Sequence, residues 1–367
     1  MIKLEKEIIS SSQLNFLVIG FVTGGLVTVP YSTQIINQDN WLAVIIGFIL
    51  SLPMVLIYIW LAQKFPQNNL LEIHDVVYGP LIGKLISAAY IVFIFNLLIY
   101  NLVYVGDFLL TYLLPETPMW IVLLMFTFVC AWAVRLGLEV IARVNPLFVV
   151  ITLFITFSTM TLLIPEMDFS NLIPLFDTPM LDFIQGVHIM ITIPYLEIVI
   201  FLFFLPSVNN KKQIKHSILF GFCFGSLFLL LPIIRNTTVL GSLVGILTSP
   251  SYESIRLIDI GNYLTRLEVL YAIALIIMLF IKSSLFYYVT VLGIAQLLRL
   301  RSYLPLVVPL GIIGICLSLI VHESSLLNID TTVDVWPFFA LPFEVFLPIL
   351  TLLLAKVRKL PKHIQGG

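Results

Sequence analysis

Long apolar segments separated by short polar stretches run through the whole chain. Each segment is close to the roughly 20 residues that a helix needs to cross the hydrocarbon core of a bilayer. The pattern predicts ten membrane-spanning helices, at Leu14–Pro30, Trp41–Leu61, Leu85–Val105, Met119–Val134, Pro146–Ile164, Phe183–Leu205, Ile218–Ile234, Val269–Leu292, Leu304–Val321 and Pro337–Leu354. The segments between them are too short for a soluble domain, so we expect residues 1–367 to form a single transmembrane domain.

The composition agrees with this interpretation and gives an orientation. The chain is 60% hydrophobic and 11% charged, against about 25% charged in an ordinary soluble domain. Lys and Arg lie almost entirely in alternate connecting segments, with Arg256 and Arg266 as exceptions on the acidic side. Because basic segments stay in the cytoplasm, we expect a multi-pass membrane protein with both termini cytoplasmic. Met1–Gln13 lacks the features of a cleavable signal peptide, and no basic cluster indicates nucleic-acid binding.

Two of the predicted spans are interrupted in the middle. The first contains Thr23-Gly24-Gly25, and the sixth contains Ile193-Pro194-Tyr195-Leu196-Glu197. An interruption frees backbone groups that find no partner in lipid, so it is tolerated where those groups face protein or a polar ligand. A Gly pair also permits close helix packing, which is the alternative for the first span. Matching interruptions in two halves of a chain favour a binding site at the membrane midplane.

The interruptions divide the chain into two halves of five spans, at about residues 12–165 and 182–355, with opposite topology. This resembles the architecture of the amino acid–polyamine–organocation transporters. The expected fold is an all-α integral membrane protein with ten helices in a 5+5 inverted repeat, in which helices 1 and 6 are discontinuous. In that architecture the ends of the half-helices carry partial charges of roughly half an electron. Such ends suit an amino-acid zwitterion.

Three charged residues are predicted to lie inside the membrane, where each costs at least about 2.5–3.5 kcal/mol. Glu197 follows the second interruption, Lys282 precedes Ser283 in the middle of span eight, and Glu344 lies in span ten. Lys282 either pairs with Glu197 or takes the place of a coupling cation, and both arrangements make sodium unnecessary. A Lys with a lowered pKa also carries a proton, which keeps proton coupling open. The alternative for each residue is a purely structural role, either as a partner in an ion pair or as a carboxyl group that stays neutral.

Span three carries a polar face. Phe93, Asn96 and Tyr100 are spaced i, i+3 and i+7 and share one side of a helix. Asn96 and Tyr100 are candidate ligand contacts, although interhelical hydrogen bonding explains them equally well. Outside the spans, Leu70–Tyr78 is typical of a short interfacial helix, and Leu240–Arg266 is either an external lid or a connector.

Motifs of catalysis are missing from the sequence. We find no His-Glu-x-x-His, no Gly-x-Ser-x-Gly and no phosphate-binding Gly-rich loop. The three cysteines lack the spacing of metal ligands. We therefore expect neither an enzyme, nor a metal site, nor a cofactor.

The sequence around the first interruption, Phe21–Pro30, resembles the Gly-x-Gly-Leu-x-x-x-Pro pattern of the B subunits of spore germinant receptors, the spore germination permeases. Glu197 matches the acidic residue of their sixth span, and Arg266-Leu267-Glu268 matches the Arg-x-Glu before their eighth. The resemblance covers essentially the whole chain. Thr23 departs from it, because the family usually has Gly there, and its side chain narrows the pocket or adds a hydroxyl.

The resemblance implies a receptor in the spore inner membrane that recognises a nutrient germinant, in many cases an amino acid. Such subunits work with a larger membrane A subunit and a C-subunit lipoprotein to trigger germination. The expected ligand-binding residues are Thr23, Gly24, Gly25, Phe93, Asn96, Tyr100, Pro194, Tyr195, Glu197, Lys282 and Ser283. The alternative function is a proton-coupled amino-acid permease.

Overall fold

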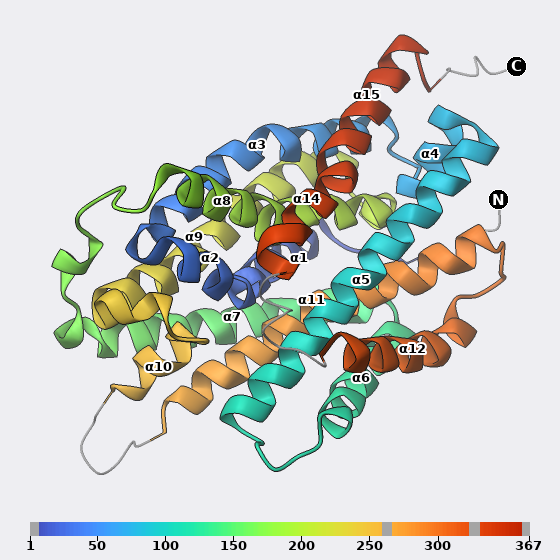
Figure 1. The fold of residues 1–367 in the computed structure, drawn as a ribbon. Coiled ribbons are helices and arrows are strands. Elements are labelled where there is room, and N and C mark those ends of the chain that lie inside the picture. The colour runs from blue at the N-terminus through green and yellow to red at the C-terminus, as the bar shows by residue number, and fades with distance from the viewer. Residues whose placement is uncertain (1–6, 259–265, 323–330, 362–367) are drawn as a thin grey trace, which may run out of the picture.

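In a computed structural model, the described residues are 7–258, 266–322 and 331–361, and they are almost entirely helical (Figure 1). Strand-like pairing in this part is limited to one isolated parallel bridge between Ile9 and Val208. Nine helical segments in the described part are long and apolar enough to cross a membrane, and Ser11–Val27 is a shorter apolar helix. The prediction of an all-α integral membrane protein is therefore confirmed. Residues 259–265 of the predicted lid or connector lie outside the described residues.

Each predicted span corresponds to a helical run, and most runs are longer than predicted. The first five are α1 to α2 (Ser11–Thr23, Gly24–Val27 and Val29–Ile36), α3 (Asn40–Lys64), α5 (Pro80–Tyr112), α6 (Met119–Leu136) and α7 (Leu138–Leu162). The predicted start of span five at Pro146 is wrong, because α7 begins eight residues earlier and Pro146 lies inside it. Proline is tolerated within membrane helices because neighbouring groups satisfy the carbonyl that it leaves free.

The second half repeats this order of elements. It comprises α8 with its continuation (Met180–Met190, Ile191–Tyr195, Leu196–Phe203 and Leu205–Ser207), α9 (Ile214–Leu240), α11 (Glu268–Leu297), α12 (Leu304–His322) and the run from Thr331–Val335 through α14 (Trp336–Leu341) and Pro342–Phe346 to α15 (Leu347–Val357). Short helices connect these runs at α4 (Leu70–Tyr78), Asn37–Asp39, Ile164–Glu166, Phe169–Leu172, Lys211–Gln213, Gly241–Gly245 and α10 (Pro250–Arg256).

The packing of the helices follows the expected inverted repeat. Helix α1 packs on α9, and its counterpart α8 packs on α3, which is the counterpart of α9. Likewise α5 packs on α12, and its counterpart α11 packs on α6, the counterpart of α12. Each of these helices also contacts its own counterpart, α5 with α11 and α6 with α12 (Figure 1). If each helix is replaced by its counterpart from the other half, the same set of contacts results. The boundaries of the two repeats in the sequence stay a prediction.

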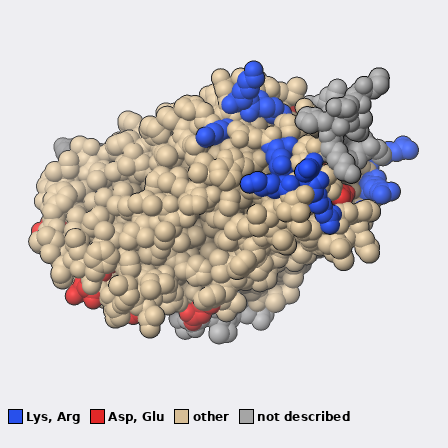
Figure 2. Space-filling view, turned by 90° about the horizontal axis from the view of Figure 1, so that it is seen from above, with Lys and Arg blue, Asp and Glu red and all other residues tan. Residues whose placement is uncertain are grey.

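Helix α4 is predicted correctly to the residue and packs against the end of the bundle. It begins with a capping box in which Asn69 and Glu72 satisfy each other's backbone N–H groups. The side chain of His74, on the buried face of α4, lies beside Ser87. Burial lowers the pKa of this imidazole to about 3, so the ring is neutral at physiological pH. The Lys and Arg side chains visible in Figure 2 gather at the end of the molecule that carries α4 and α15.

The last membrane-spanning run is anchored by two tyrosines. Its middle, Pro342–Phe346, is a wider π-helical stretch. The Tyr90 hydroxyl donates to the carbonyl oxygen of Phe343 at 2.5 Å, and the Tyr58 hydroxyl donates to that of Glu344. Tyr58 lies on α3 and Tyr90 on α5, so hydrogen bonds to the backbone fix this stretch between two helices of the other half.

We expect Tyr58→Phe and Tyr90→Phe each to lower the thermal unfolding midpoint, because each removes a buried hydrogen bond worth about 0.5–1.5 kcal/mol. Tyr104→Phe is the control, since the Tyr104 hydroxyl forms no hydrogen bond within the described residues. Thermal unfolding of the purified protein measures the effect. Equal midpoints for all three variants would contradict this role of the two hydroxyls.

Candidate ligand-binding site

The first interruption is present at the predicted residues, but the chain remains helical. Helix α1 ends at Thr23, and the residues Gly24–Val27 form a tighter 3-10 turn before α2 begins at Val29. The backbone N–H and the hydroxyl of Thr28 both donate to the carbonyl oxygen of Gly25, at 3.0 and 2.8 Å. The Thr23 hydroxyl donates to the carbonyl oxygen of Ile19 at 2.8 Å. Threonine side chains therefore satisfy carbonyl groups around this turn, as membrane burial requires.

The second interruption also changes the winding of the helix. Helix α8 widens into a π-helical stretch at Ile191–Tyr195 and then tightens into a 3-10 helix at Leu196–Phe203. Pro194 lies in the wide stretch and has no N–H to donate, so it interrupts the regular hydrogen bonding of the helix there. Such switches between helix types are often found at functional sites.

The two interruptions touch each other. A Cβ atom added at Gly25 would lie 2.6 Å from the Cβ atom of Pro194, closer than side-chain atoms approach in proteins. A Cβ atom at Gly24 would lie 3.3 Å from the carbonyl oxygen of Met278 and 3.4 Å from the Lys282 side chain. Glycine is therefore required at position 25, where a side chain would overlap Pro194, and at position 24 it allows close contact with α11.

A buried ion pair lies next to this contact. The Lys282 Nζ atom is 2.6 Å from the Glu197 Oε2 atom, and both side chains are 1% exposed. Lys282 comes from α11, while Glu197 is the second residue of the 3-10 helix Leu196–Phe203. The ammonium group also lies 5.3 Å from the ring centroid of Phe21 and 5.9 Å from that of Phe286, within the range of cation–π attraction. Of the two predicted arrangements of Lys282, the structure has the pair with Glu197.

A second carboxyl group lies near this pair. Glu344 is fully buried, and neither of its oxygens has a hydrogen-bond partner among the described residues. The charges of Glu197 and Lys282 both act on it electrostatically. The membrane interior therefore holds two carboxyl groups and one ammonium group close together.

A cavity of about 50 Å³ opens beside the ion pair. Its wall combines aromatic and polar side chains with the two paired charges and comprises Val27, Thr28, Tyr31, Leu97, Tyr100, Asn101, Val103, Tyr104, Asp107, Ile193, Glu197, Lys282 and Trp336. Since about 10–15 Å³ is enough for one water molecule, the cavity has room for a few waters, and a larger ligand requires it to widen.

The cavity includes some of the predicted ligand-binding residues and leaves out others. Tyr100, Glu197 and Lys282 line it. Phe93 does not, because its ring is stacked on Phe343 and Trp336 with centroids 4.6 and 5.7 Å apart.

Several other predicted residues also lie outside the cavity wall. Asn96 donates to the carbonyl oxygen of Val92 in its own helix, at 2.9 Å. The Tyr195 hydroxyl points to the carbonyl oxygen of Val44 on α3, at 3.1 Å. Ser283 is fully buried, and its hydroxyl has no partner among the described residues.

The face of α5 that lines the cavity is turned relative to the predicted one. Leu97, Tyr100, Asn101 and Tyr104 follow the spacing i, i+3, i+4 and i+7 and all line the wall. Asn101 is the polar residue that the sequence interpretation missed, and its side-chain oxygen has no partner among the described residues. Asn101 lies one residue after Tyr100 and four after Leu97, so it belongs to the neighbouring face, and no pattern in the sequence separates the two faces.

A further missed feature closes one end of the cavity. Asp107 lines the wall near the end of α5, and its Oδ1 atom is 2.7 Å from the Nδ1 atom of His322 at the end of α12. The contact is an ion pair when the imidazole is protonated, and both side chains are about one-third exposed. Asp107 lies two residues beyond the predicted span Leu85–Val105, where side chains are usually solvated, so the span pattern does not indicate its position in the cavity wall.

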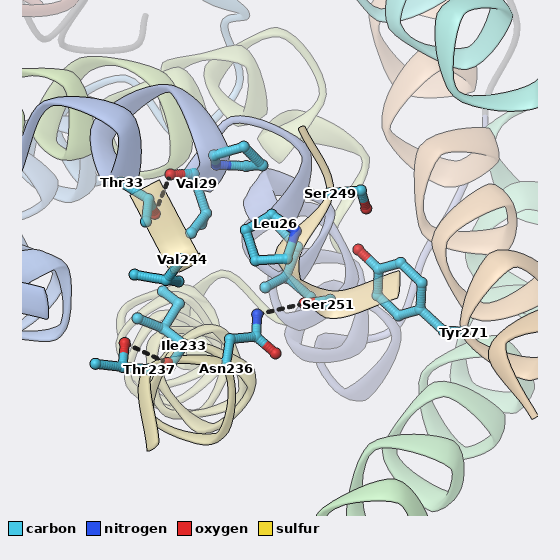
Figure 3. A pocket seen from close by; sticks show the side chains of 12 residues that line it. Leu26, Val29, Thr33, Ile233, Asn236, Thr237, Val244, Ser249, Ser251 and Tyr271 are labelled. Atoms are coloured by element: carbon cyan, nitrogen blue, oxygen red, sulfur yellow. Dashed lines mark hydrogen bonds between the residues drawn. The ribbon is translucent and has the colours of Figure 1, made fainter. Parts of the chain in front are cut away.

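A separate small cavity lies between α2, α9 and α10 (Figure 3). It has a volume of about 10 Å³, room for about one water molecule. Asn236 reaches across one side of it and donates to Ser251 at 2.7 Å. This cavity does not rival the cavity beside Lys282 as a ligand site, because it is smaller and none of its wall residues belongs to an ion pair within the described part of the chain.

We expect Gly25→Leu to abolish ligand response while the protein still accumulates, because its side chain forces α8 away from the first interruption. Ligand binding to membranes that contain the variant measures this. Gly314→Ala is the control, since an added Cβ atom there lies 3.7 Å or more from its neighbours. Normal binding by the Gly25 variant would remove the first interruption from the site.

We expect Lys282→Met and Glu197→Gln each to destabilise the protein strongly. Removing one partner of a buried ion pair costs about 3–5 kcal/mol, because the other charge stays uncompensated. The double variant should lose less than the sum of the single losses, which thermal unfolding measures. Arg301→Met, at an exposed position, is the control for loss of positive charge. Strictly additive losses would show that the two side chains do not depend on each other.

The chain is similar to known spore germination proteins along its length. A family model described as spore germination protein matches residues 8–326. The chain is 28% identical over 370 residues to spore germination protein KB of Bacillus subtilis (strain 168), covering 99% of both chains. It is 24% identical to spore germination protein YndE of the same organism, covering 96% of this chain and 97% of that one. Spore germination protein XB of Bacillus anthracis is 23% identical and is matched over 71% of this chain and 73% of its own length.

Solved transporter structures share the fold at low sequence identity. Mhp1, a nucleobase-cation-symport-1 family transporter in a closed conformation with bromovinylhydantoin bound, matches with a TM-score of 0.73 at 11% identity, over 95% of this chain and 78% of that one. The Eremococcus coleocola manganese transporter, in complex with an aromatic bis-isothiourea compound, matches with a TM-score of 0.52 at 13% identity, over 95% and 84%. The fold prediction is confirmed, and the chain belongs to the spore germination protein family of membrane proteins.

Proposed function

We propose that this chain is the B subunit of a spore nutrient germinant receptor, which recognises a small nutrient, an amino acid, at the cavity beside Lys282. The observation that carries the proposal is the contact between Gly25 and Pro194 next to the Lys282–Glu197 pair. At this contact the two interrupted helices, the elements able to move, lie beside two opposite charges that a zwitterion can contact. Membership of the spore germination protein family supports the biological role.

The ion pair suggests how a zwitterion is recognised. An α-amino acid places its carboxylate near Lys282 and its ammonium group near Glu197, with the unpartnered oxygen of Asn101 as a further acceptor. Each protein charge then keeps an opposite charge beside it. A ligand with a single charge separates the pair and leaves one buried charge uncompensated, which is strongly unfavourable. The pair therefore selects for zwitterions.

Recognition becomes a signal through a population shift. The cavity of about 50 Å³ must widen to admit an amino acid, so the ligand binds a wider conformation more tightly than the one described here. Widening moves the contact between the two interrupted helices. In the proposal, the receptor A subunit and the C-subunit lipoprotein read this change in the spore inner membrane, with both termini of this chain in the cytoplasm.

A proton-coupled amino-acid permease is the second candidate function. The observation that favours it is Glu344, a fully buried carboxyl group without a hydrogen-bond partner among the described residues. A carboxyl group in that position can bind and release a proton close to the ion pair. The transporter fold is compatible with both functions and does not separate them.

Ligand selectivity tests the recognition model. We expect an α-amino acid that elicits a response to bind at least about tenfold more tightly than its decarboxylated amine or its deaminated acid, the factor for about 1.4 kcal/mol. Lys282→Ala should weaken the amino-acid response far more than Arg301→Ala, because Arg301 is exposed at the end of the bundle. Competition binding to membranes measures both. Equal effects of the two substitutions would exclude Lys282 from ligand recognition.

Flux separates the receptor from the permease. We expect proteoliposomes containing the purified chain to bind the labelled amino acid without accumulating it across an imposed proton gradient. If accumulation is seen, Glu344→Gln is the variant to compare, because it keeps the shape of the side chain but cannot carry the proton. Accumulation that is lost in this variant would replace the pure receptor by a proton-coupled permease.

A further inference from the structure

A carboxylate at one end of the cavity beside Lys282 lacks a permanently charged partner. Asp107 lines this cavity near the end of α5, and its side chain is about one-third exposed. Its Oδ1 atom lies 2.7 Å from the Nδ1 atom of His322, the last residue of α12. Within the described residues, no Lys or Arg side chain lies within 4.0 Å of this carboxylate. A close positive charge therefore compensates it only while the imidazole is protonated.

The packing of α5 on α11 shows how the wall of the cavity is ordered along the bundle. A Cβ atom added at Gly293 would lie 2.8 Å from the side chain of Ile91, and the rings of Tyr271 and Phe108 have centroids 6.3 Å apart. The two helices therefore run in opposite directions side by side.

This order separates Asp107 from the ion pair. Lys282 is midway in sequence between Tyr271 and Gly293, so it lies level with the residues midway between Ile91 and Phe108, close to Tyr100. From there to Asp107 is two helical turns, or about 10 Å. An ammonium group at Asp107 is thus clear of the Lys282–Glu197 pair.

Aromatic rings accompany the carboxylate. Tyr104 precedes Asp107 by three residues, so the two side chains share one side of α5, and both line the cavity. Tyr31 lines it from α2. The charge of Asp107 acts electrostatically on both phenol groups. Because the faces of aromatic rings attract ammonium groups, this end of the cavity combines two kinds of attraction for a cation.

The combination suits an ammonium group better than a metal ion. Calcium and magnesium ions take six or more oxygen ligands. Among the residues that the structure describes, no group of three or more His, Cys, Asp or Glu side chains is arranged to hold a metal ion. A primary ammonium group needs only a carboxylate and neighbouring rings, and every α-amino acid that is a zwitterion carries an ammonium group.

We propose that Asp107, with the rings of Tyr31 and Tyr104, forms an outer subsite that binds the ammonium group of a nutrient before the nutrient reaches the Lys282–Glu197 pair. This inference rests on the proposed function. The subsite lies at the end of the bundle opposite α4 and α15, which is the outer end in the proposed orientation. It gives the cavity a first contact for the positive end of a zwitterion.

The imidazole of His322 makes the subsite depend on pH. Its protonated form competes with the ammonium group for the carboxylate, and histidine changes charge between about pH 5 and 8. Acid therefore weakens binding at the subsite and alkali strengthens it. The phenols that face this end, Tyr31 on α2, Tyr104 on α5 and Tyr271 on α11, do not titrate in that range. Helix α6 carries no charged residue before Arg135, near its other end.

The first experiment uses methylammonium, a small ion with an ammonium group and no carboxylate. The full-length protein in lipid nanodiscs is unfolded by heating at about pH 8, with methylammonium chloride replacing sodium chloride at constant ionic strength. A ligand that binds only the folded state raises the unfolding midpoint in a saturable way. We expect this rise with methylammonium and not with sodium. Equal midpoints in the two salts overturn the subsite.

Substitutions in the subsite locate the effect. Asp107→Asn keeps the shape of the side chain but removes its charge, and should weaken the apparent methylammonium affinity by at least about tenfold, as for a hydrogen bond to an ion. Tyr104→Leu should weaken it about threefold through loss of the ring, and Tyr104→Phe should restore it. Glu116→Gln, at an exposed position after α5, is the control for loss of a negative charge. Unchanged affinity in Asp107→Asn overturns the proposal.

The pH dependence tests the competition by His322. In the unmodified protein, the apparent methylammonium affinity should be about fivefold higher at pH 8 than at pH 5.5, the factor for a partly exposed ion pair of about 1 kcal/mol. His322→Gln keeps a hydrogen-bond donor without the charge and should bind equally at both pH values. His188→Gln is the control, because His188 lies on α8 against the ring of Phe338. A pH dependence that persists in His322→Gln overturns the role of His322.

The methylammonium result and amino-acid binding separate the subsite from the proposed function. If amino acids do not bind while the methylammonium effect depends on Asp107, the ammonium subsite is supported and the proposed function is overturned. If amino acids bind with the same affinity to the unmodified protein and to Asp107→Asn, and methylammonium has no effect, the subsite is overturned and the proposed function is retained.

Discussion

Inside a bilayer every backbone N–H and C=O group must find its partner within the protein, and the middle of this molecule is organised by that constraint. The interrupted helices do not open into loops. They tighten into 3-10 turns or widen into π-helical turns, and hydroxyl groups of Thr28 and other side chains donate hydrogen bonds to carbonyl oxygens. The last membrane-spanning run also widens into a π-helical stretch at Glu344, where the Tyr58 hydroxyl donates to the carbonyl oxygen of Glu344. Three local changes of winding therefore occur around one centre.

The changes of winding determine where the charges lie. Because Gly25 has no side chain, the backbone of the first interruption rests on Pro194. The turn after Pro194 then directs Glu197 to Lys282, which is held against Gly24 from α11. A buried pair of this kind is weak evidence for stability, since desolvation offsets most of the attraction. Its value in the proposed function lies elsewhere, because two adjacent opposite charges can be exchanged for the two charges of a zwitterion.

The sequence predicts the architecture well because membrane helices leave a strong and simple signal. Each of the ten predicted spans falls on a helical run in the described part of the chain, and Gly and Pro mark both interruptions. Helix ends are less well predicted, as at Pro146, because α7 continues through polar residues such as Glu139 and Arg143 and because Pro does not end a helix in lipid.

The wall of the site is predicted only in part. Lys282 and Glu197 stand out as charges in apolar segments, and their pairing follows from the fold. The rotation of α5 does not, because nearly the whole helix is apolar and its hydrophobic periodicity is weak, so Asn96 and Asn101 are equally plausible in the sequence. Asp107 is missed because it lies just beyond a predicted span, where solvation is the usual state. Which residue faces inward depends on tertiary packing that no local pattern encodes.

The most direct test of the central claim is protection of the cavity from chemical labelling. In a variant without its three native cysteines, Asn101→Cys and Asn96→Cys place a thiol on the same helix, on the cavity wall and outside it. The rate of labelling by a small charged thiol reagent is measured in membranes with and without a mixture of the common amino acids. The ligand-binding cavity proposed here predicts slower labelling of Asn101→Cys with amino acids present and no change for Asn96→Cys. Equal rates at Asn101→Cys with and without amino acids would contradict it.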